Sequence, residues 1–137
     1  MYDSENIFAK ILKGDIPSHR IYEDDTTYAF LDVMPRSDGH TLIIPKATAT
    51  GLLDASPEVI ASCMATIQKL APKIVEAMGA DGFLIQQFNG EAAGQTVFHL
   101  HFHIVPRKLG VSLRPHAGEM ADPETLASHA HIIRAAL

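Results

Sequence analysis

The sequence predicts an α+β fold: a mainly antiparallel sheet combined with a short N-terminal helix, one long helix and a C-terminal helix. From Phe98 to Val105, large apolar residues alternate with histidines, which is the two-residue period of a strand. From Ser56 to Gly79, apolar residues instead follow helical spacing. The expected strands come in groups separated by helices, and this order favours antiparallel pairing.

The first third of the chain predicts one helix and three strands. Ser4 is expected to cap a helix over about 5–13, and Gly14 is expected to end it in a left-handed conformation. Asp24-Asp25 lies between two short apolar runs and predicts the turn of a hairpin. The strands are expected at 20–23, 27–31 and 41–45, and Pro45 ends the last of them.

The remainder predicts the long helix, two strands and the C-terminal helix. Ser56-Pro57-Glu58 combines an N-cap, a proline at the first helical position and a carboxylate at the positive helix end. Pro72 lies inside this helix and should kink it. The later elements are expected as a strand at 82–88, a loop at 89–95, the histidine strand at 97–106, and a helix from Asp122-Pro123-Glu124 to about Ala136.

Length and composition indicate one domain, residues 1–137, with a core at about 5–107 and a tail at 108–137. The 137 residues are 47% hydrophobic and carry a net charge of −5, with no basic run for a nucleic-acid polymer. The single cysteine, Cys63, lies in an apolar helical stretch, which favours a buried and inert thiol. No apolar run has membrane-spanning length and the N-terminus lacks signal-peptide features, so we expect a cytoplasmic protein that does not interact with membranes.

Three histidines, His99, His101 and His103, are expected on one face of the last strand because alternate strand residues share a face. A stripe without function is one interpretation, although burying imidazoles is costly without hydrogen bonds. The second is a metal site, since zinc commonly binds three histidines and a water. The third is nucleophilic catalysis by a neutral imidazole. The three histidines alone do not separate the last two.

The loop before the histidines favours phosphate chemistry. Residues 89–96 read Asn-Gly-Glu-Ala-Ala-Gly-Gln-Thr, and such small residues allow the backbone to approach a ligand. Consecutive N–H groups could surround an oxyanion. A metal site would call for nearby carboxylates to orient the histidines, and only Glu91 offers one. Taken alone, the loop would be a glycine-containing turn; beside three histidines, it predicts a phosphate-binding site.

The segment from Asn89 to Arg107 resembles the signature of the histidine-triad (HIT) family, in which three histidines alternate with apolar residues. Further similarity, in family order, lies at 7–17, 24–25, 29–32 and 39–46, so that the resemblance covers 5 to about 107. The tail, including Leu113-Arg114-Pro115-His116, is similar to bacterial members.

This resemblance implies a HIT-like homodimer that cleaves a bond at the α-phosphate of a purine nucleotide. By position, His101 would be the nucleophile and would form a transient nucleotidyl-histidine. His99 and His103 would flank it, hold phosphate oxygens and set its tautomer. His40 would be a fourth histidine behind the triad. The implied nucleotide contacts are Asn89, Gln95 and Thr96 at the phosphate or leaving group, Asp32 at the ribose, and Ile7, Phe8, Ile11, Phe30 and Val33 around the base.

The reaction implied by the resemblance has alternatives. We favour a nucleoside phosphoramidase; the other possibilities are a dinucleoside polyphosphate hydrolase, a metallohydrolase and a non-catalytic nucleotide-binding regulator. Some family members have a Cys-x-x-Cys zinc motif on the first helix, where this chain has Asn6 and Ala9, so we expect neither metal nor cofactor. The remaining histidines are expected at the surface: His19, His116, His129 and His131.

Overall fold

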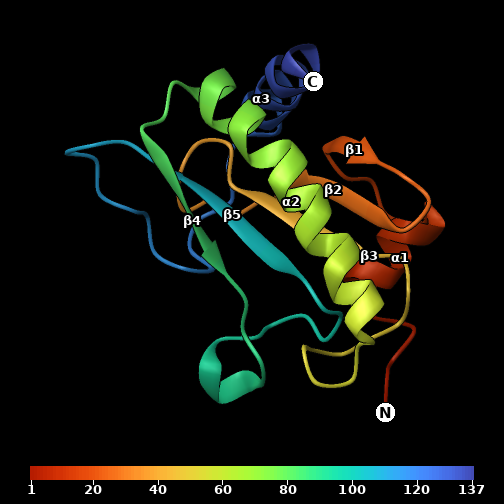
Figure 1. The fold of residues 1–137 in the computed structure, drawn as a ribbon. Coiled ribbons are helices and arrows are strands. Elements are labelled where there is room, and N and C mark those ends of the chain that lie inside the picture. Colours follow the sequence, from red (N-terminus) through yellow and green to blue (C-terminus); the bar gives the residue numbers. More distant parts are fainter.

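A computed structural model describes residues 1–137 and shows three α-helices with a five-stranded sheet (Figure 1). The predicted α+β class is confirmed. The α-helices are α1 (Ile7–Lys13), α2 (Pro57–Met78) and α3 (Pro123–Ala136), and a short 3-10 helix, η1, spans Glu91–Ala93. The strands are β1 (Arg20–Glu23), β2 (Thr27–Leu31), β3 (Thr41–Pro45), β4 (Gly82–Gln86) and β5 (Phe102–Arg107).

Every pair of neighbouring strands is antiparallel, in the order β1-β2-β3-β5-β4. The β1–β2 hairpin turns at Asp24-Asp25, as predicted. The long helix α2 fills the connection between β3 and β4, and β5 then returns between these two strands. The last strand in sequence order therefore lies inside the sheet, between β3 and the edge strand β4, and all of its residues except Arg107 are buried.

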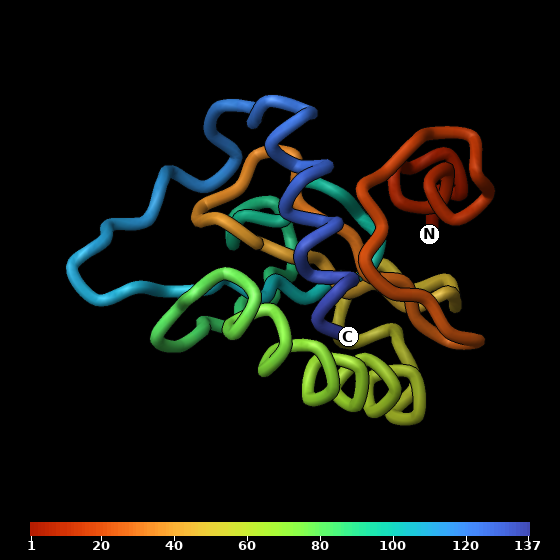
Figure 2. Tube along the Cα trace, turned by 90° about the horizontal axis from the view of Figure 1, so that it is seen from above, coloured from red at the N-terminus to blue at the C-terminus, as the bar shows by residue number.

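The two faces of the sheet carry different layers (Figures 1 and 2). Helices α2 and α3 pack on one face and form the main core with residues such as Leu31, Ile43 and Ile104. Helix α1 covers part of the other face, where Phe8 packs with Phe30. Because strand residues alternate between faces, Phe102 and Ile104 belong to the α2 layer, whereas His101 and His103 point to the α1 layer.

The helix boundaries follow their capping residues. Ser56 and Asp122 cap α2 and α3, and Gly14 and Gly79 end α1 and α2 with positive φ, as predicted. The predicted cap of α1 at Ser4 is wrong. Asn6 is the N-cap, because its side-chain oxygen accepts the N–H of Ala9 at 2.9 Å, and the helix begins at Ile7.

Two strands are shorter than predicted. Strand β4 ends at Gln86 rather than at residue 88, and β5 begins at Phe102 rather than at Val97. Pairing between β3 and β5 stops at Ile43 opposite Phe102; farther on, the N–H of Leu100 donates to the carbonyl of Ala49, beyond the end of β3. His99 and His101 are therefore held by irregular backbone immediately before the strand.

Two further features bear on the sequence predictions. Cys63 is fully buried in α2, and burial raises the pKa of its thiol to about 12, as expected for an inert cysteine. Helix α2 runs past Pro72 without interruption. None of the helices combines the length and apolar character required for crossing a bilayer.

Candidate active site

A cavity of about 240 Å³ opens on the α1 face of the sheet. One end is apolar and is formed by α1 with the neighbouring part of β2; the other end carries imidazole rings and a threonine hydroxyl. Of the residues that the resemblance implies, those that line the cavity are Ile7, Phe8, Ile11, Phe30, Asp32, Val33, Thr96, His101 and His103. The cavity therefore has an apolar end beside a polar, nitrogen-rich end.

The tautomer of His101 is set by the backbone. Its Nδ1 lies 2.7 Å from the carbonyl oxygen of His99, and a carbonyl can only accept, so Nδ1 carries the proton. The Nε2 atom is then left with a free lone pair. Phe8 packs edge-on against the ring at 5.0 Å between centroids, which restricts its rotation. His101 thus presents an unprotonated nitrogen in a fixed orientation.

His40 and His103 form a chain of hydrogen bonds whose direction is also set by the backbone. The N–H of Arg36 donates to Nδ1 of His40 at 2.9 Å, so the proton of His40 is on Nε2. This Nε2–H donates to Nδ1 of His103 at 2.9 Å, which places the His103 proton on its own Nε2. That N–H is buried and has no partner in the protein. A buried donor without a partner is costly, and a bound ligand oxygen would satisfy it.

Burial keeps these histidines neutral. Desolvation lowers the pKa of His40 to about 3, and positive charge on Arg36 adds to this effect. Desolvation also lowers the pKa values of His99, His101 and His103. The rings of His101 and His103, which line the cavity, are therefore uncharged at neutral pH.

His99 lies outside the cavity lining. Its Nε2–H donates to the carbonyl of Pro45 at 2.8 Å, and the Tyr2 hydroxyl binds Nδ1. Both ring nitrogens are thus occupied, and the structure does not bring this side chain to the position where we expected it to hold a phosphate oxygen. Its contribution to the site is the main-chain carbonyl that orients His101.

Two of the three polar loop residues also point elsewhere. The Gln95 side chain accepts the N–H of Gly90 and donates to the carbonyls of Thr50 and Val97, so it ties the loop together from within. The Asn89 side chain accepts the N–H of Leu52 at 2.8 Å. Neither residue lines the cavity, whereas Thr96 does.

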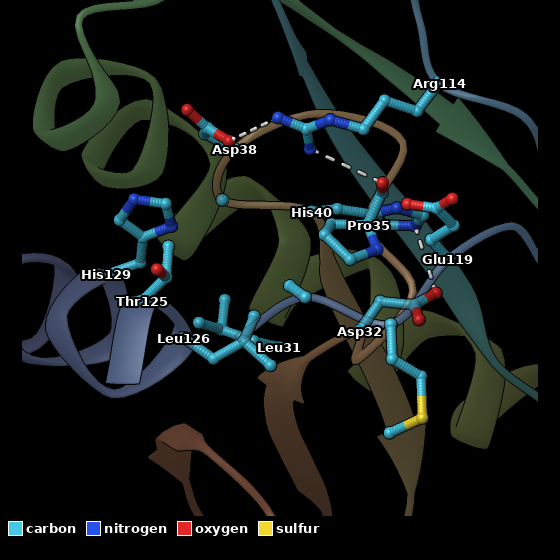
Figure 3. Close-up of a pocket in the computed structure, with 13 residues that line it drawn as sticks. Leu31, Asp32, Pro35, Asp38, His40, Arg114, Glu119, Thr125, Leu126 and His129 are labelled. Carbon is cyan, nitrogen blue, oxygen red and sulfur yellow. Dashed lines mark hydrogen bonds and ion pairs between the residues drawn. The ribbon is translucent and has the colours of Figure 1, made fainter. Parts of the chain in front are cut away.

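Asp32 lies between the cavity and a second hollow on the other side of the strand end. This second hollow lies beneath α3 and contains His40, Arg114 and Glu119 (Figure 3). One Asp32 oxygen accepts the N–H of Met34 at 2.8 Å, and the other lies 3.5 Å from Nε2 of His40. Burial raises the pKa of Asp32. The carboxylate can therefore contact a ligand in the cavity while remaining close to His40.

Asp32, His40 and His103 have donor atoms within 4.8 Å of one another, close enough for metal ligands. Their hydrogen bonds support a different use. The Nε2 atom of His40 carries a proton because the opposite ring nitrogen already accepts from Arg36, and a protonated nitrogen cannot bind a metal. As arranged, the group forms a hydrogen-bonded proton path.

His116 was expected at the surface, and the structure confirms that it is exposed. Its ring is exposed but lines the cavity, 5.1 Å from the ring of Phe88 and 6.0 Å from the ring of His103. No local pattern in the tail indicated this placement, because it arises from long-range contacts of the tail.

A protein with this antiparallel sheet and with neutral, hydrogen-bonded imidazoles beside an apolar cavity has the architecture of a histidine-triad protein. The HIT domain family model matches residues 13–110, and the chain belongs to this family.

Two of the similar sequences are enzymes. An adenylylsulfatase from Arabidopsis thaliana is 43% identical over 102 residues, which are 74% of this chain and 52% of the plant protein. An adenosine 5′-monophosphoramidase from Saccharomyces cerevisiae is 41% identical over 106 residues, or 77% of this chain and 65% of the yeast protein. The chain thus spans about half to two thirds of these two relatives.

Solved structures extend the similarity to the whole chain. A HIT-like protein from Bartonella henselae, described as involved in cell-cycle regulation, is 47% identical with a TM-score of 0.93, and the match covers 100% of both chains. A zinc-bound histidine-triad protein from Mycobacterium smegmatis is 40% identical with a TM-score of 0.86, covering 96% of this chain and 92% of that one.

Proposed function

We propose that the protein hydrolyses nucleoside phosphoramidates or related nucleotides at the α-phosphate, through a covalent nucleotidyl-histidine on His101. The observation that carries this proposal is the pairing of a free lone pair on Nε2 of His101 with the unpartnered Nε2–H of His103 in one cavity. The nucleophile, His101, and the residue that donates a hydrogen bond to the phosphate, His103, are thus both in the protonation state that the chemistry requires.

In the first step, the lone pair of His101 attacks the α-phosphorus, and the bond from phosphorus to the leaving group breaks. The leaving atom takes the bonding electrons and needs a proton. The Nδ1–H of His101 stays on the carbonyl of His99, which stabilises the positive ring of the intermediate. Water then attacks phosphorus and gives up a proton, which balances the proton that the leaving atom took up in the first step. The bond to Nε2 breaks, and the nucleoside monophosphate leaves with His101 regenerated.

The cavity provides a place for each part of such a substrate. A purine base fits the apolar end between Ile7, Phe8 and Phe30, and Asp32 can accept from a ribose hydroxyl. The N–H of His103 and the hydroxyl of Thr96 can donate to phosphate oxygens. The names of two relatives support this proposal, because an adenylylsulfatase and an adenosine 5′-monophosphoramidase both imply an adenylyl group bound to a different leaving group.

We also propose that the protein is a homodimer. Strand β4 lies at an edge of the sheet and exposes Phe83 and Ile85, with 46% and 38% of their surface accessible. Exposed apolar residues on an edge strand favour association with a second chain.

The test follows release of AMP from adenosine 5′-phosphoramidate and from diadenosine tetraphosphate, with His101→Ala beside His131→Ala, an exposed histidine of α3 outside the cavity. Release by the unchanged protein and by His131→Ala, lost in His101→Ala, is expected, together with a mass increase of one AMP residue on rapid quenching. Preference for the tetraphosphate would identify a dinucleoside polyphosphate hydrolase. Binding of AMP without turnover of either compound would refute the catalytic proposal and indicate a regulator.

A further inference from the structure

The tail brings a third histidine, His116, to the cavity lining, beside His101 and His103, and its position is well defined. Nε2 of His116 lies 3.2 Å from the carbonyl oxygen of Gly94, so this nitrogen carries a proton and donates. A Cβ at Gly94, whose φ is +105°, would lie 3.9 Å from the same nitrogen and in a strained backbone. Nδ1 of His116 has no hydrogen-bond partner in the protein and is the nitrogen available to a ligand.

The backbone just before His116 is tied to the loop that contains Arg36. The N–H of Arg114 donates to the carbonyl of Arg36 at 2.8 Å, and Nε of Arg36 donates back to the carbonyl of Arg114 at 3.2 Å. The guanidinium of Arg114 also pairs with Asp38 at 2.8 Å (Figure 3). The next residue after His116, Ala117, is the chain's only non-glycine residue with a positive φ. Such conformations are costly and persist where surrounding contacts require them.

The rings around the cavity form a row. The centroid distances are 5.0 Å from Phe8 to His101, 5.1 Å from His101 to His103, and 6.0 Å from His103 to His116. A nucleotide with its base at the Phe8 end and its α-phosphorus at His101 would extend its leaving group toward the far end of this row. His116 stands at that end.

Departure of the leaving group requires a proton that the buried histidines cannot readily supply. Burial opposes the charged form of His40, His101 and His103, so none of them holds a second proton to give away at neutral pH. His116 is exposed to solvent, and its Nδ1 has no hydrogen-bond partner in the protein, so this ring can exchange a proton with water and with a bound ligand. It is the cavity residue best placed to exchange a proton with both solvent and substrate.

We propose that His116 is the proton donor to the leaving group, an inference that rests on the proposed function. In its doubly protonated form, Nε2–H stays on the carbonyl of Gly94, and Nδ1–H is transferred to the amine nitrogen as the bond from phosphorus to nitrogen breaks. His116 becomes neutral at that point. It regains a proton from the water that attacks the nucleotidyl-histidine, and AMP leaves.

The test compares two AMP derivatives that differ only in the leaving group: a phosphoramidate of propylamine, which must be protonated to leave, and the p-nitrophenyl ester, which leaves as a stable anion. His116→Ala is expected to lose about 10²-fold in kcat/KM on the phosphoramidate and less than about threefold on the ester. His116→Gln, which retains an amide donor for Gly94 but cannot transfer a proton, is expected to behave in the same way. His131→Ala is the matched control and should leave both rates unchanged.

Each other outcome overturns the inference in a recognisable way. An equal loss on both substrates would show that His116 contributes to binding or structure rather than to proton transfer, and no loss on either would remove it from the reaction. If circular dichroism shows that His116→Ala is unfolded, the comparison of the two substrates is made with His116→Gln instead. If the unchanged protein cleaves neither compound, or if His101→Ala still cleaves them, the proposed function fails first and this inference fails with it.

Discussion

His40 and His103 share a hydrogen bond of 2.9 Å between Nε2 of the former and Nδ1 of the latter, and both rings are at least 97% buried. The bond originates at the main-chain N–H of Arg36 and ends at an N–H of His103 that faces no protein acceptor. A peptide group thus dictates, through two side chains, which nitrogen is offered to a substrate.

Loss of the His40 side chain should therefore remove the hydrogen bond that fixes the His103 proton on Nε2. We expect His40→Ala to lower kcat/KM for AMP release by about 10²-fold, a magnitude typical of a disrupted proton-transfer group. His40→Gln retains an N–H for His103 and should lose less. Nitrogen-15 NMR of the imidazole rings provides the direct check, because His103 should carry its proton on Nε2 in the unchanged protein. A proton on Nδ1 would contradict the assignment.

Stability should fall as the solution becomes acidic. Burial lowers the pKa of His40 to about 3, whereas an unfolded histidine titrates near 6.5, so the unfolded chain binds more protons between these values. Stability is fully present above about pH 6.5 and is lost progressively below it. His40 alone should cost ~2 kcal/mol at pH 5, and the three triad histidines, whose pKa values are also lowered by burial, add to this loss.

Urea unfolding at pH 7.5 and pH 5.0 measures this loss. The His40→Gln variant lacks the titrating group and should lose less stability between the two pH values than the unchanged protein. Equal losses would show that His40 accepts protons freely in the folded state.

The turn of the first hairpin depends on one of two adjacent aspartates. The Asp24 carboxylate accepts from the backbone N–H groups of Thr26 and Thr27 and from the Tyr22 hydroxyl. Asp25 is exposed and accepts none of these bonds. We expect Asp24→Ala to lower the free energy of unfolding by about 1–3 kcal/mol and Asp25→Ala to change it by less than about 0.5 kcal/mol. Urea denaturation of the two variants side by side would show whether the asymmetry is real.

The proposed dimer can be tested at the edge strand. A charge at Phe83 would be desolvated by a partner chain, so Phe83→Glu should convert a particle of twice 14.9 kDa into one of 14.9 kDa in light scattering. Met120→Glu changes an apolar residue of the tail that is even more exposed than Phe83, and it should leave the mass unaltered. A monomer before mutation would refute the proposed assembly.

Elements with a local signal were predictable from sequence. Ser56 with Pro57 and Gly79 marks both ends of α2, and Asp122 marks the start of α3, because capping is a matter of a few neighbouring residues. The first helix was misplaced at its start because two residues, Ser4 and Asn6, can each cap. The Asp3 carboxylate accepts the N–H of Glu5, and after this turn it is Asn6 that lies at the N-cap position and accepts the N–H of Ala9.

The site was predictable in part. Alternation predicts that His101 and His103 share one face, and both line the cavity. The apolar residues that the resemblance implies around a base also line it. The roles of individual ring nitrogens did not follow, because they depend on carbonyls and N–H groups brought close by the fold. His116 was missed for the same reason: its approach to the cavity depends on contacts between Arg114 and the loop containing Arg36, about 80 residues earlier in the chain.

The anchoring of these rings to main-chain atoms has a consequence for how the protein can diversify. The carbonyls of His99 and Gly94 and the N–H of Arg36 would still be present if the side chains lining the apolar end were exchanged. The groups that orient the imidazole rings are thereby separate from the side chains that form the apolar end of the cavity. Under the proposed function, substitutions at Ile7 or Val33 can alter the base that is accepted while the ring nitrogens of the histidines keep their protons in place, so new substrates can be acquired without rebuilding the polar end of the cavity.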